Sequence, residues 1–288
     1  MTVNIGHLRK WIGQQRTLTD DMSPFSAKAM AALFDDSMAL EAGDRLPASW
    51  HWLYFKEHAN TSGVGADGHP LRGDFLPPIT LERRMWAAGE LSVERPLLLG
   101  IEATKQSTIE SVELKEGRSG PLVFVSLRHR ILQNGECCIN ELQHLVYRDL
   151  PSKGGQTLPP GVMLSVKPDW EGIISTDPVL LFRFSALTYN AHRIHYDRDY
   201  ARNQEFYPDL VVHGPLLAMW LLYFLKQKNP SASVVSFEFR ALRPNFCDKA
   251  ITLCAKREAN RIHLWSTDES GAVCVQATAR VKENPYEQ

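Results

Sequence analysis

The sequence predicts an α+β protein built from two similar halves in tandem. Residues 95–148 show the alternating apolar and polar pattern of antiparallel strands, and residues 234–281 show it again. Each half ends in two strand segments joined by a tight turn, Asn134-Gly135 in the first and Ser270-Gly271 in the second. The halves share this pattern but not their residues, so the chain is a degenerate repeat of one antiparallel sheet with one helix.

The first half begins with helical and aromatic segments. Residues 1–45 predict helices, because a Ser-Pro pair at 23–24 is a typical helix start and an alanine-rich segment follows it. The aromatic segment 49–55 predicts a strand, and residues 80–88 predict a short helix. Residues 63–68 have the spacing G-x-G-x-x-G, but prolines follow instead of a helix. We therefore expect a flexible lid or a loop that covers a ligand, and not a dinucleotide site.

The remaining segments complete the two halves. Residues 95–148 predict an all-β segment with a turn at 117–120, and the segment 150–172 is rich in proline and glycine. This segment predicts a linker, so the expected domains are residues 1–150 and 173–288, with residues 151–172 between them. Further strand candidates close the chain as a meander at 234–242, 250–256, 261–267 and 272–281.

A polar stretch at residues 183–197 and an apolar run at 210–225 organise the second half. Gly214 and Pro215 predict a helix start, and every residue from 216 to 225 is apolar or aromatic, which is typical of a buried helix. The run has about half of the ~20 residues that a membrane span needs. We expect a core helix whose N-terminal amides face a reactive loop formed by the polar stretch.

Composition argues against several classes of protein. The net charge is −1, whereas nucleic-acid surfaces are usually strongly basic. The five cysteines include no C-x-x-C pair, which excludes a zinc ribbon or a disulfide framework and predicts reduced, mostly buried thiols. The N-terminus has no apolar segment typical of a secretory signal, so we expect a cytoplasmic protein that binds neither membranes nor nucleic acid.

The polar stretch also resembles a known family. The general signature of the MaoC-like hotdog dehydratases is [ST]-G-D-x-N-P-[LIV]-H, and this chain keeps only Thr188, Ile194 and His195 of it. A narrower subgroup contains mesaconyl-C4-CoA and itaconyl-CoA hydratases and mitochondrial 3-hydroxyacyl-thioester dehydratases. Its form Phe-Ser-Ala-Leu-Thr-Tyr-Asn-x-His-x-Ile-His-Tyr-Asp matches residues 184–197 throughout. Also typical of the subgroup are Val212-His-Gly-Pro-Leu-Leu-Ala218, Gly68-His-Pro and Phe75-Leu-Pro-Pro.

This resemblance covers nearly the whole chain and implies a double hotdog, with two antiparallel sheets each wrapped on a central helix. It implies a hydratase that adds water to a 2-enoyl-CoA, and the subgroup suggests a short branched dicarboxylic acyl group such as mesaconyl-C4-CoA or itaconyl-CoA. It implies no cofactor besides the coenzyme A thioester substrate, and a homodimer or higher homo-oligomer. The alternatives are a 3-hydroxyacyl-thioester dehydratase of fatty-acid synthesis, a hotdog thioesterase, or a non-catalytic acyl-CoA-binding protein.

Hydration of an enoyl thioester needs a base for water, an acid for C2 and donors for the enolate oxygen. His195 is the expected base, because imidazole exchanges protons near neutral pH, and the resemblance implies the same role. Asn190 stands where the wider family has its catalytic aspartate, and an amide cannot act as a base. We expect Asn190 to orient water while His195 transfers the proton, alone or with Tyr189 or His192. The backbone N–H of Gly214 is the expected oxyanion donor.

Coenzyme A carries phosphates, so cationic side chains should gather at the mouth of the pocket. The substrate-binding candidates are Tyr189, His192, Arg72, Arg83, Arg84, Arg240 and Arg243. If the acyl group carries a second carboxylate, a buried arginine should face it. The spacing of His192, His195 and Asp197 is also that of metal ligands, but no further ligand cluster accompanies them, so no metal is expected. His213 is expected to be structural.

Overall fold

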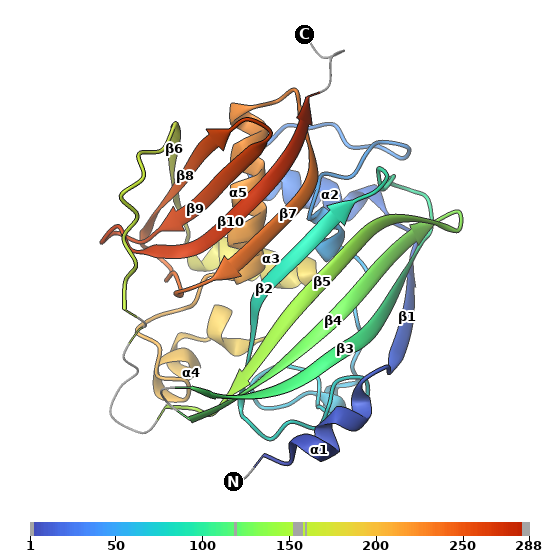
Figure 1. Cartoon of the computed structure of the whole chain (residues 1–288), viewed down its shortest axis with the longest axis vertical. Coiled ribbons are helices and arrows are strands. Elements are labelled where there is room, and N and C mark those ends of the chain that lie inside the picture. Colours follow the sequence, from blue (N-terminus) through green and yellow to red (C-terminus); the bar gives the residue numbers. More distant parts are fainter. Residues whose placement is uncertain (1–2, 118–119, 152–157, 159, 284–288) are drawn as a thin grey trace.

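The strands of both halves join edge to edge in one antiparallel sheet. The computed structural model describes residues 3–117, 120–151, 158 and 160–283. The first half contributes β1 (Gln15–Asp20), β2 (Arg83–Val93), β3 (Ala103–Gly117), β4 (Gly120–Gln133) and β5 (Glu136–Arg148). The second half contributes β6 (Trp170–Ser175), β7 (Ala232–Ala241), β8 (Ala250–Glu258), β9 (Arg261–Thr267) and β10 (Val273–Glu283). Within the described residues they form a ten-stranded sheet in the order β1-β3-β4-β5-β2-β7-β10-β9-β8-β6 (Figure 1). The halves meet where β2 pairs with β7.

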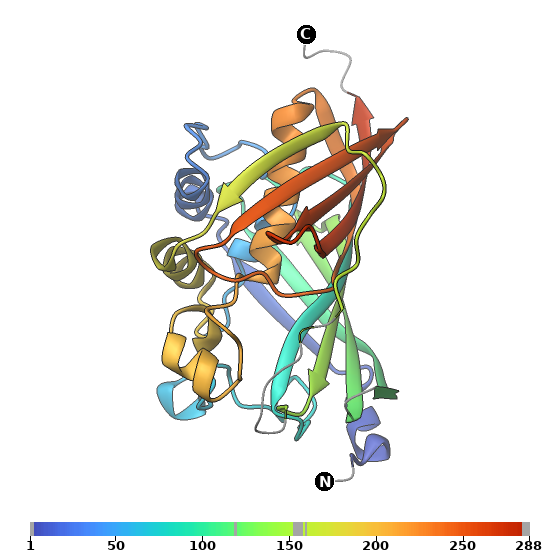
Figure 2. The same cartoon turned by 90° about the vertical axis from the view of Figure 1, so that its left-hand side faces the viewer.

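The α-helices in the described residues are α1 (Ile5–Leu8), α2 (Pro24–Leu33), α3 (Pro178–Thr188), α4 (Arg198–Asn203) and α5 (Gly214–Lys228). Helices α2 to α5 lie on one side of this sheet, and α1 lies at its end (Figure 2). Short 3-10 helices cover Arg9–Trp11, Trp50–Leu53, Thr61–Gly63 and Arg193–His195. Figure 2 shows α5 against the strands of the second half, with α2 and α3 beyond it. No helix in the described ranges is both long and apolar enough to cross a membrane.

The helix α5 confirms the prediction made from the apolar run. It begins at Gly214, Pro215 occupies its first turn, and nine of its fifteen residues are buried. Lys226 and Lys228 lie in its last turn, where the helix dipole favours positive charge. Each leucine or phenylalanine buried in this way contributes roughly 1.5–3 kcal/mol to stability. This burial holds the N-terminus of α5 at one place in the fold, next to β2.

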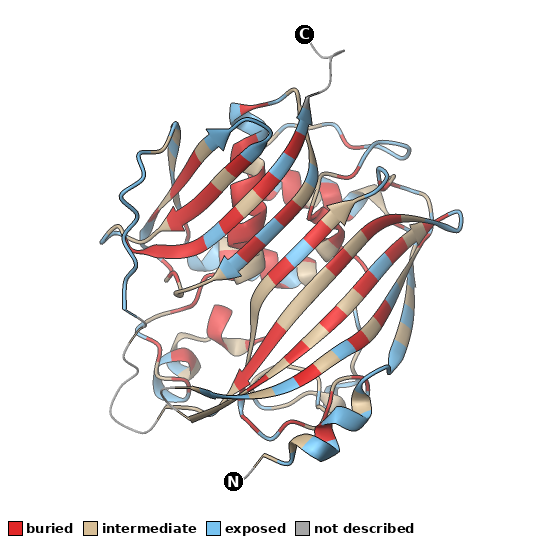
Figure 3. Cartoon of the chain, viewed as in Figure 1, coloured by how far each residue is buried: buried red, intermediate tan, exposed pale blue. Residues whose placement is uncertain are grey.

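The two halves differ in how their sheets are covered. In the second half α5 packs directly on β7, β8, β9 and β10. In the first half α2 packs mainly against α3 and the 3-10 helix at 50–53. Phe34 directly follows α2, and the centroid of its ring lies 4.7 Å from that of Tyr223 in α5. Buried and less buried residues alternate along β4, so the sheet still has an inner face (Figure 3). Loops, and not a central helix, cover much of that face, which leaves room for a cavity.

Several predictions for the first half were wrong. Segment 80–88 is not a helix, because β2 starts at Arg83 and pairs with β5 on one side and β7 on the other. Segment 49–55 contains a 3-10 helix and not a strand, and β1 lies within the stretch predicted as helical. At β1 and β2, strand pairing with distant segments overrides local helix propensity. The prediction of an all-β segment over 95–148 is confirmed, while its turn at 118–119 lies outside the described residues.

The second half contains two elements that the sequence reading missed. Helix α3 occupies the first part of the polar stretch, with the Asp177 carboxylate accepting from Leu180 N at 2.7 Å and Pro178 in the first turn. Strand β6 starts at Trp170, inside the predicted linker, and pairs with β8. Residues 152–157 and 159 of that linker lie outside the described residues, so the domain division stays a prediction. The strand predictions after α5 are confirmed, and all five cysteines are free, four of them buried.

Candidate active site

A cavity of about 1300 Å³ is lined by residues of both halves. The second half contributes His195, Asn190 and Gly214, the three residues predicted to be catalytic. The first half contributes the segment 68–72 and parts of β2, β3, β4 and β5. The structure thus brings the imidazole at 195 and the amide at 214 to the same cavity.

The catalytic loop, residues 189–195, leaves α3 through a sharp reversal. Tyr189 adopts a left-handed conformation (φ +54°) that ends α3, and its side chain is 60% exposed. Asn190 Oδ1 accepts a hydrogen bond from the His192 amide at 3.1 Å, which shapes the turn. The 3-10 helix Arg193–His195 then directs His195 into the protein. Asn190 therefore uses its oxygen within the loop and retains its NH₂ group for other partners.

His195 is held as a neutral imidazole with one free nitrogen. Its Nδ1 lies 2.7 Å from the Val211 carbonyl oxygen, which can only accept, so Nδ1 carries the hydrogen and Nε2 the lone pair. The His213 ring stacks on it at 3.6 Å, and His213 Nε2 bonds Ser185 Oγ at 2.8 Å. Burial lowers the pKa of His195 well below its usual value, and His213 and His192 add to this. The free Nε2 can accept a proton from water.

Gly214 is the first residue of α5 and lines the cavity. The first amides of a helix have no acceptor within that helix, and the helix dipole favours negative charge at this end. A Cβ added at Gly214 would have the Trp86 carbonyl oxygen, at 4.0 Å, as its nearest neighbour. The α-carbon of Gly214 therefore has open space beside it in the cavity wall.

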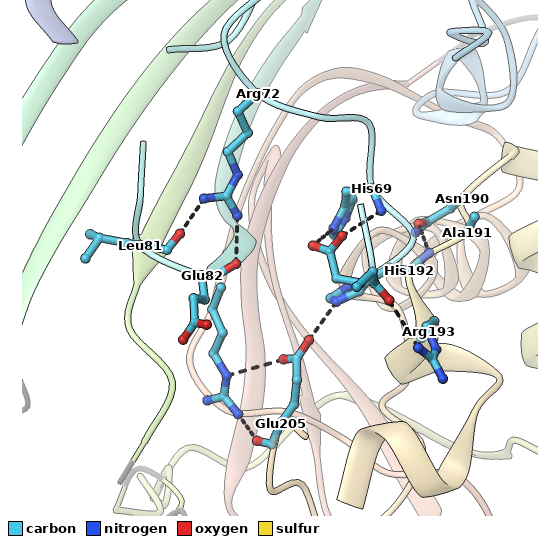
Figure 4. A network of polar contacts seen from close by, with 12 residues as sticks. His69, Arg72, Leu81, Glu82, Asn190, Ala191, His192, Arg193 and Glu205 are labelled. Carbon is cyan, nitrogen blue, oxygen red and sulfur yellow. Dashed lines mark hydrogen bonds and ion pairs between the residues drawn. The ribbon is translucent and has the colours of Figure 1, made fainter. Parts of the chain in front are cut away.

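His192 belongs to a buried polar network behind the loop. Its Nε2 lies 3.0 Å from Glu205 Oε1 (Figure 4). Glu205 Oε2 lies 3.3 Å from Nε of Arg83. All three residues are buried. Arg83 was predicted to bind substrate, but it pairs with Glu205 and is not part of the cavity wall. Arg240 is exposed on β7 and does not line the cavity either. Both predictions are corrected, because strand position turns these side chains elsewhere.

The other predicted arginines, Arg72, Arg84 and Arg243, line the cavity and differ in the partners that their guanidinium groups bind. Arg72 donates to the carbonyl oxygens of Leu81 and, at 2.7 Å, of Glu82 (Figure 4). It also donates to the Ile79 carbonyl oxygen at 2.7 Å, so it holds the segment before β2. Arg243 pairs with Asp268 at 3.1 Å. Arg84 is half-buried beside Tyr147, and no carboxylate in the described part of the chain forms an ion pair with it. Arg84 is thus the predicted arginine with the most freedom to bind an anion.

The loop at 63–68 lies directly on the catalytic loop. Arg193 N–H donates to the Asp67 carbonyl oxygen at 2.9 Å, and Gly65 N–H donates to the His69 carbonyl oxygen at 2.8 Å. Gly68 has a φ of +91°, and a Cβ at this residue would lie 1.7 Å from the Ala191 carbonyl oxygen. Glycine is therefore required for this close approach. These contacts dock the segment on the catalytic loop, at the wall of the cavity.

Three groups near His195 have the mutual distances of metal ligands. Ligand atoms of Asp67, His69 and His192 lie within 4.8 Å of one another. They differ from the set weighed in the sequence, because Asp197 instead caps α4 and pairs with Arg193 at 2.7 Å. Two of the three groups bond each other, Asp67 with His69, and His192 bonds Glu205. The sequence analysis missed Asp67, His69 and Glu205, although Gly68-His-Pro belonged to the family pattern.

Comparisons with known proteins agree with this architecture. A family model described as hydroxyacyl-thioester dehydratase type 2 matches residues 49–247. Mesaconyl-C(4)-CoA hydratase of Chloroflexus aurantiacus is 42% identical over 275 residues, covering 94% of this chain and 96% of the relative. HtdX of Mycobacterium tuberculosis superposes with a TM-score of 0.67 at 16% identity, over 93% of this chain and 99% of HtdX. A second protein of that organism, described as a double hotdog, has a TM-score of 0.56 at 12% identity, over 94% of this chain and 96% of its own. The fold is a double hotdog.

Proposed function

Because the chain belongs to the hydroxyacyl-thioester dehydratase type 2 family, we propose that it reversibly hydrates a short, branched 2-enoyl-CoA that carries a free carboxylate. Mesaconyl-C4-CoA is the first candidate substrate, since the relative that is 42% identical is named for it, and itaconyl-CoA is the second. The observation that carries the proposal is the convergence of His195 and Gly214 on one cavity.

The reaction follows from the chemistry of these two groups. The Gly214 N–H binds the thioester carbonyl oxygen, where negative charge develops in the transition state. His195 Nε2 removes a proton from water as the oxygen bonds to C3, and the electron pair of the double bond moves onto the enolate. The imidazolium then gives the proton to C2, which completes the addition. A lowered pKa makes this imidazolium a strong acid, so the proton returns readily.

Arg84 is our candidate for recognising the free carboxylate of the acyl group. Its guanidinium is half-buried in the cavity wall, and no ion pair with another described residue occupies it. Its positive charge is felt at His69, on the same wall, where it helps to lower the pKa. A planar guanidinium binds a carboxylate through two parallel hydrogen bonds, which gives both affinity and orientation.

Replacing Arg84 by methionine is expected to reduce kcat/KM for mesaconyl-C4-CoA about 10- to 100-fold, the loss of one or two charge-assisted hydrogen bonds. Crotonyl-CoA has no free carboxylate, so its kcat/KM should change less than threefold by this estimate. Arg240→Met, on the exposed side of β7, is the matched control. An equal loss with both substrates would contradict a role in carboxylate recognition.

A 3-hydroxyacyl-thioester dehydratase of fatty-acid synthesis is the second candidate. Apolar side chains of Phe75, Leu127 and Leu145 line part of the cavity and suit an alkyl chain. Polar side chains of Lys105, Ser107 and His129 line it as well, which disfavours a purely apolar tunnel. The polar wall and Arg84 together favour the dicarboxylic substrate.

One assay separates these functions from hydrolysis of the thioester. The protein is incubated with crotonyl-CoA, mesaconyl-C4-CoA, itaconyl-CoA and a long-chain 2-enoyl-CoA, and both the enoyl absorbance and free thiol are followed. Loss of absorbance without thiol, fastest with mesaconyl-C4-CoA, is the expected result. Release of thiol without hydration would identify a thioesterase instead. A preference for the long chain would favour the fatty-acid dehydratase.

Three further expectations complete the proposal. The reaction needs no cofactor, because His195 and Gly214 supply the proton transfer and the oxyanion donor. A homodimer is expected because soluble proteins commonly form symmetric pairs, and light scattering in solution tests it. We also expect the protein to be cytoplasmic, which cell fractionation tests.

A further inference from the structure

The cavity holds a second oriented imidazole. An amide at position 190 cannot hold water as a carboxylate would, and its oxygen already accepts the His192 amide. We propose that His69, oriented by Asp67, is a catalytic residue that binds the attacking water and directs its oxygen toward C3. This inference rests on the proposed hydratase function and adds a residue from the first half to the reaction.

Asp67 fixes both the backbone and the ring of His69. Its Oδ2 lies 3.0 Å from His69 Nδ1, and its Oδ1 accepts the His69 backbone N–H at 3.0 Å. An ionised carboxylate can only accept, so Nδ1 carries the hydrogen and Nε2 keeps its lone pair. Burial alone would raise the pKa of Asp67, but the hydrogen bonds from the His69 ring and backbone N–H hold it below its usual value. Asp67 therefore stays ionised and keeps His69 in one tautomer.

His69 remains neutral at physiological pH. Burial lowers its pKa to about 3, and the positive charge of Arg84 acts in the same direction. A neutral imidazole with a free Nε2 accepts a hydrogen bond from water. Two imidazoles with the same tautomer, one from each half, thus line one cavity.

Ring contacts through His192 limit the distance between the His69 and His195 imidazoles. The His69 ring lies 4.2 Å from the His192 ring, and the His192 ring lies 5.5 Å from the His195 ring. The His69 and His195 centroids are therefore at most 9.7 Å apart, the sum of those two separations. Figure 4 shows His69 and His192 next to each other, with Asn190 and Ala191 beside them.

The docking of the first-half loop explains why His69 is held there. The Arg193 N–H bonds the Asp67 carbonyl oxygen at 2.9 Å, and Arg193 Nη1 donates to the Ala66 carbonyl oxygen at 3.2 Å. Gly68, between Asp67 and His69, packs on Ala191 with no room for a Cβ. The same loop that carries His195 therefore positions Asp67 and His69.

The proton balance does not require His69 to change its charge. One O–H of the water is hydrogen-bonded to His195 Nε2 and the other to His69 Nε2. The first O–H bond breaks as the C3–O bond forms, and that proton ends on C2 by way of His195. The second O–H remains with the new hydroxyl group of the product.

The test compares His69→Leu, His69→Gln and Asp67→Asn in the full chain, with mesaconyl-C4-CoA as the probe. Leucine cannot accept a hydrogen bond, so kcat should fall about 100-fold while KM stays within threefold. Glutamine offers an amide oxygen in a similar place and should recover part of the rate. Asparagine at 67 can donate to Nδ1, which would place the hydrogen on Nε2, so a loss close to that of His69→Leu is expected.

Glu258→Gln is the matched control, because Glu258 pairs with His263 at 3.3 Å on the exposed surface. Its kinetics should equal those of the unmodified protein. A His69→Leu variant with full kcat, or one that fails only through KM, would overturn the proposal. If His69→Leu does not fold, the thermal unfolding curve will show it, and a wild-type rate in His69→Gln and Asp67→Asn would equally overturn it. Absence of hydration by the unmodified protein would instead reject the proposed function.

Discussion

Replacing His195 by glutamine is expected to lower kcat for hydration by about 10³-fold, the upper range for loss of a positioned general base. Glutamine is similar in size and can hydrogen-bond the Val211 carbonyl, which the imidazole reaches at 2.7 Å, but it cannot take a proton. The loss should therefore appear in kcat, with KM little changed. Initial rates followed by enoyl absorbance, together with thermal unfolding of both proteins, measure it.

His263→Gln serves as the control for this replacement, since His263 is exposed and its partner Glu258 lies on the surface. The control should keep the full rate. A His195→Gln variant that retains more than a tenth of the wild-type kcat would show that another group removes the proton. His69 would then be the first alternative, and the His69→Leu variant would have to lose more than His195→Gln.

Lowering the pH from 7.5 to 5 is expected to destabilise the protein by several kcal/mol. Burial lowers the pKa of His69, His129 and His213 to about 3 each, and that of His195 well below its usual value. In the unfolded chain each of these side chains titrates near ~6.5. Between about pH 6.5 and pH 3 the unfolded state therefore binds protons that the folded state excludes, so stability is complete above this window and falls as pH decreases.

Each such histidine should cost about 2 kcal/mol of unfolding free energy over this pH change. Chemical denaturation at pH 7.5, 6.5, 5.5 and 5 measures the slope. His129→Gln should lower the pH dependence by about 2 kcal/mol, because His129 bonds Ser107 and Gln143 inside the first half and takes no proposed part in proton transfer. A free energy of unfolding that is constant between pH 7.5 and pH 5 would show that these imidazoles are not buried as neutral groups.

Both predictions arise from one structural arrangement. Neutral imidazoles are placed in a cavity where their charged forms are costly, which keeps them unprotonated at neutral pH and makes the imidazolium a strong acid once it forms. The same burial that prepares the site for catalysis also makes the fold sensitive to acid. We therefore expect the pH limits of activity and of stability to lie close together on the acidic side.

The sequence alone was enough to predict those helices and strands whose pattern is contained in neighbouring residues. The apolar run from 216 to 225, with Gly214-Pro215 before it, predicted a buried helix, and α5 is that helix. The strands after α5 were equally predictable, because alternation along each strand reflects one buried face. The loop around His195 was identified as functional because its polar groups are too dense for a core segment and match a family pattern.

Only the tertiary structure decided which distant groups meet. Strand β2 forms because β5 and β7 supply its hydrogen bonds, and this pairing turns Arg83 toward Glu205 and places Arg84 in the cavity wall. Asp67 and His69 lie more than a hundred residues before His195, and the packing of Gly68 on Ala191 brings them to it. The pattern of apolar and polar residues along a segment shows which of its faces is buried. Which other segment covers that face depends on contacts between residues far apart in the sequence. For that reason the sequence identified the loop of His195, and the fold supplied the groups around it.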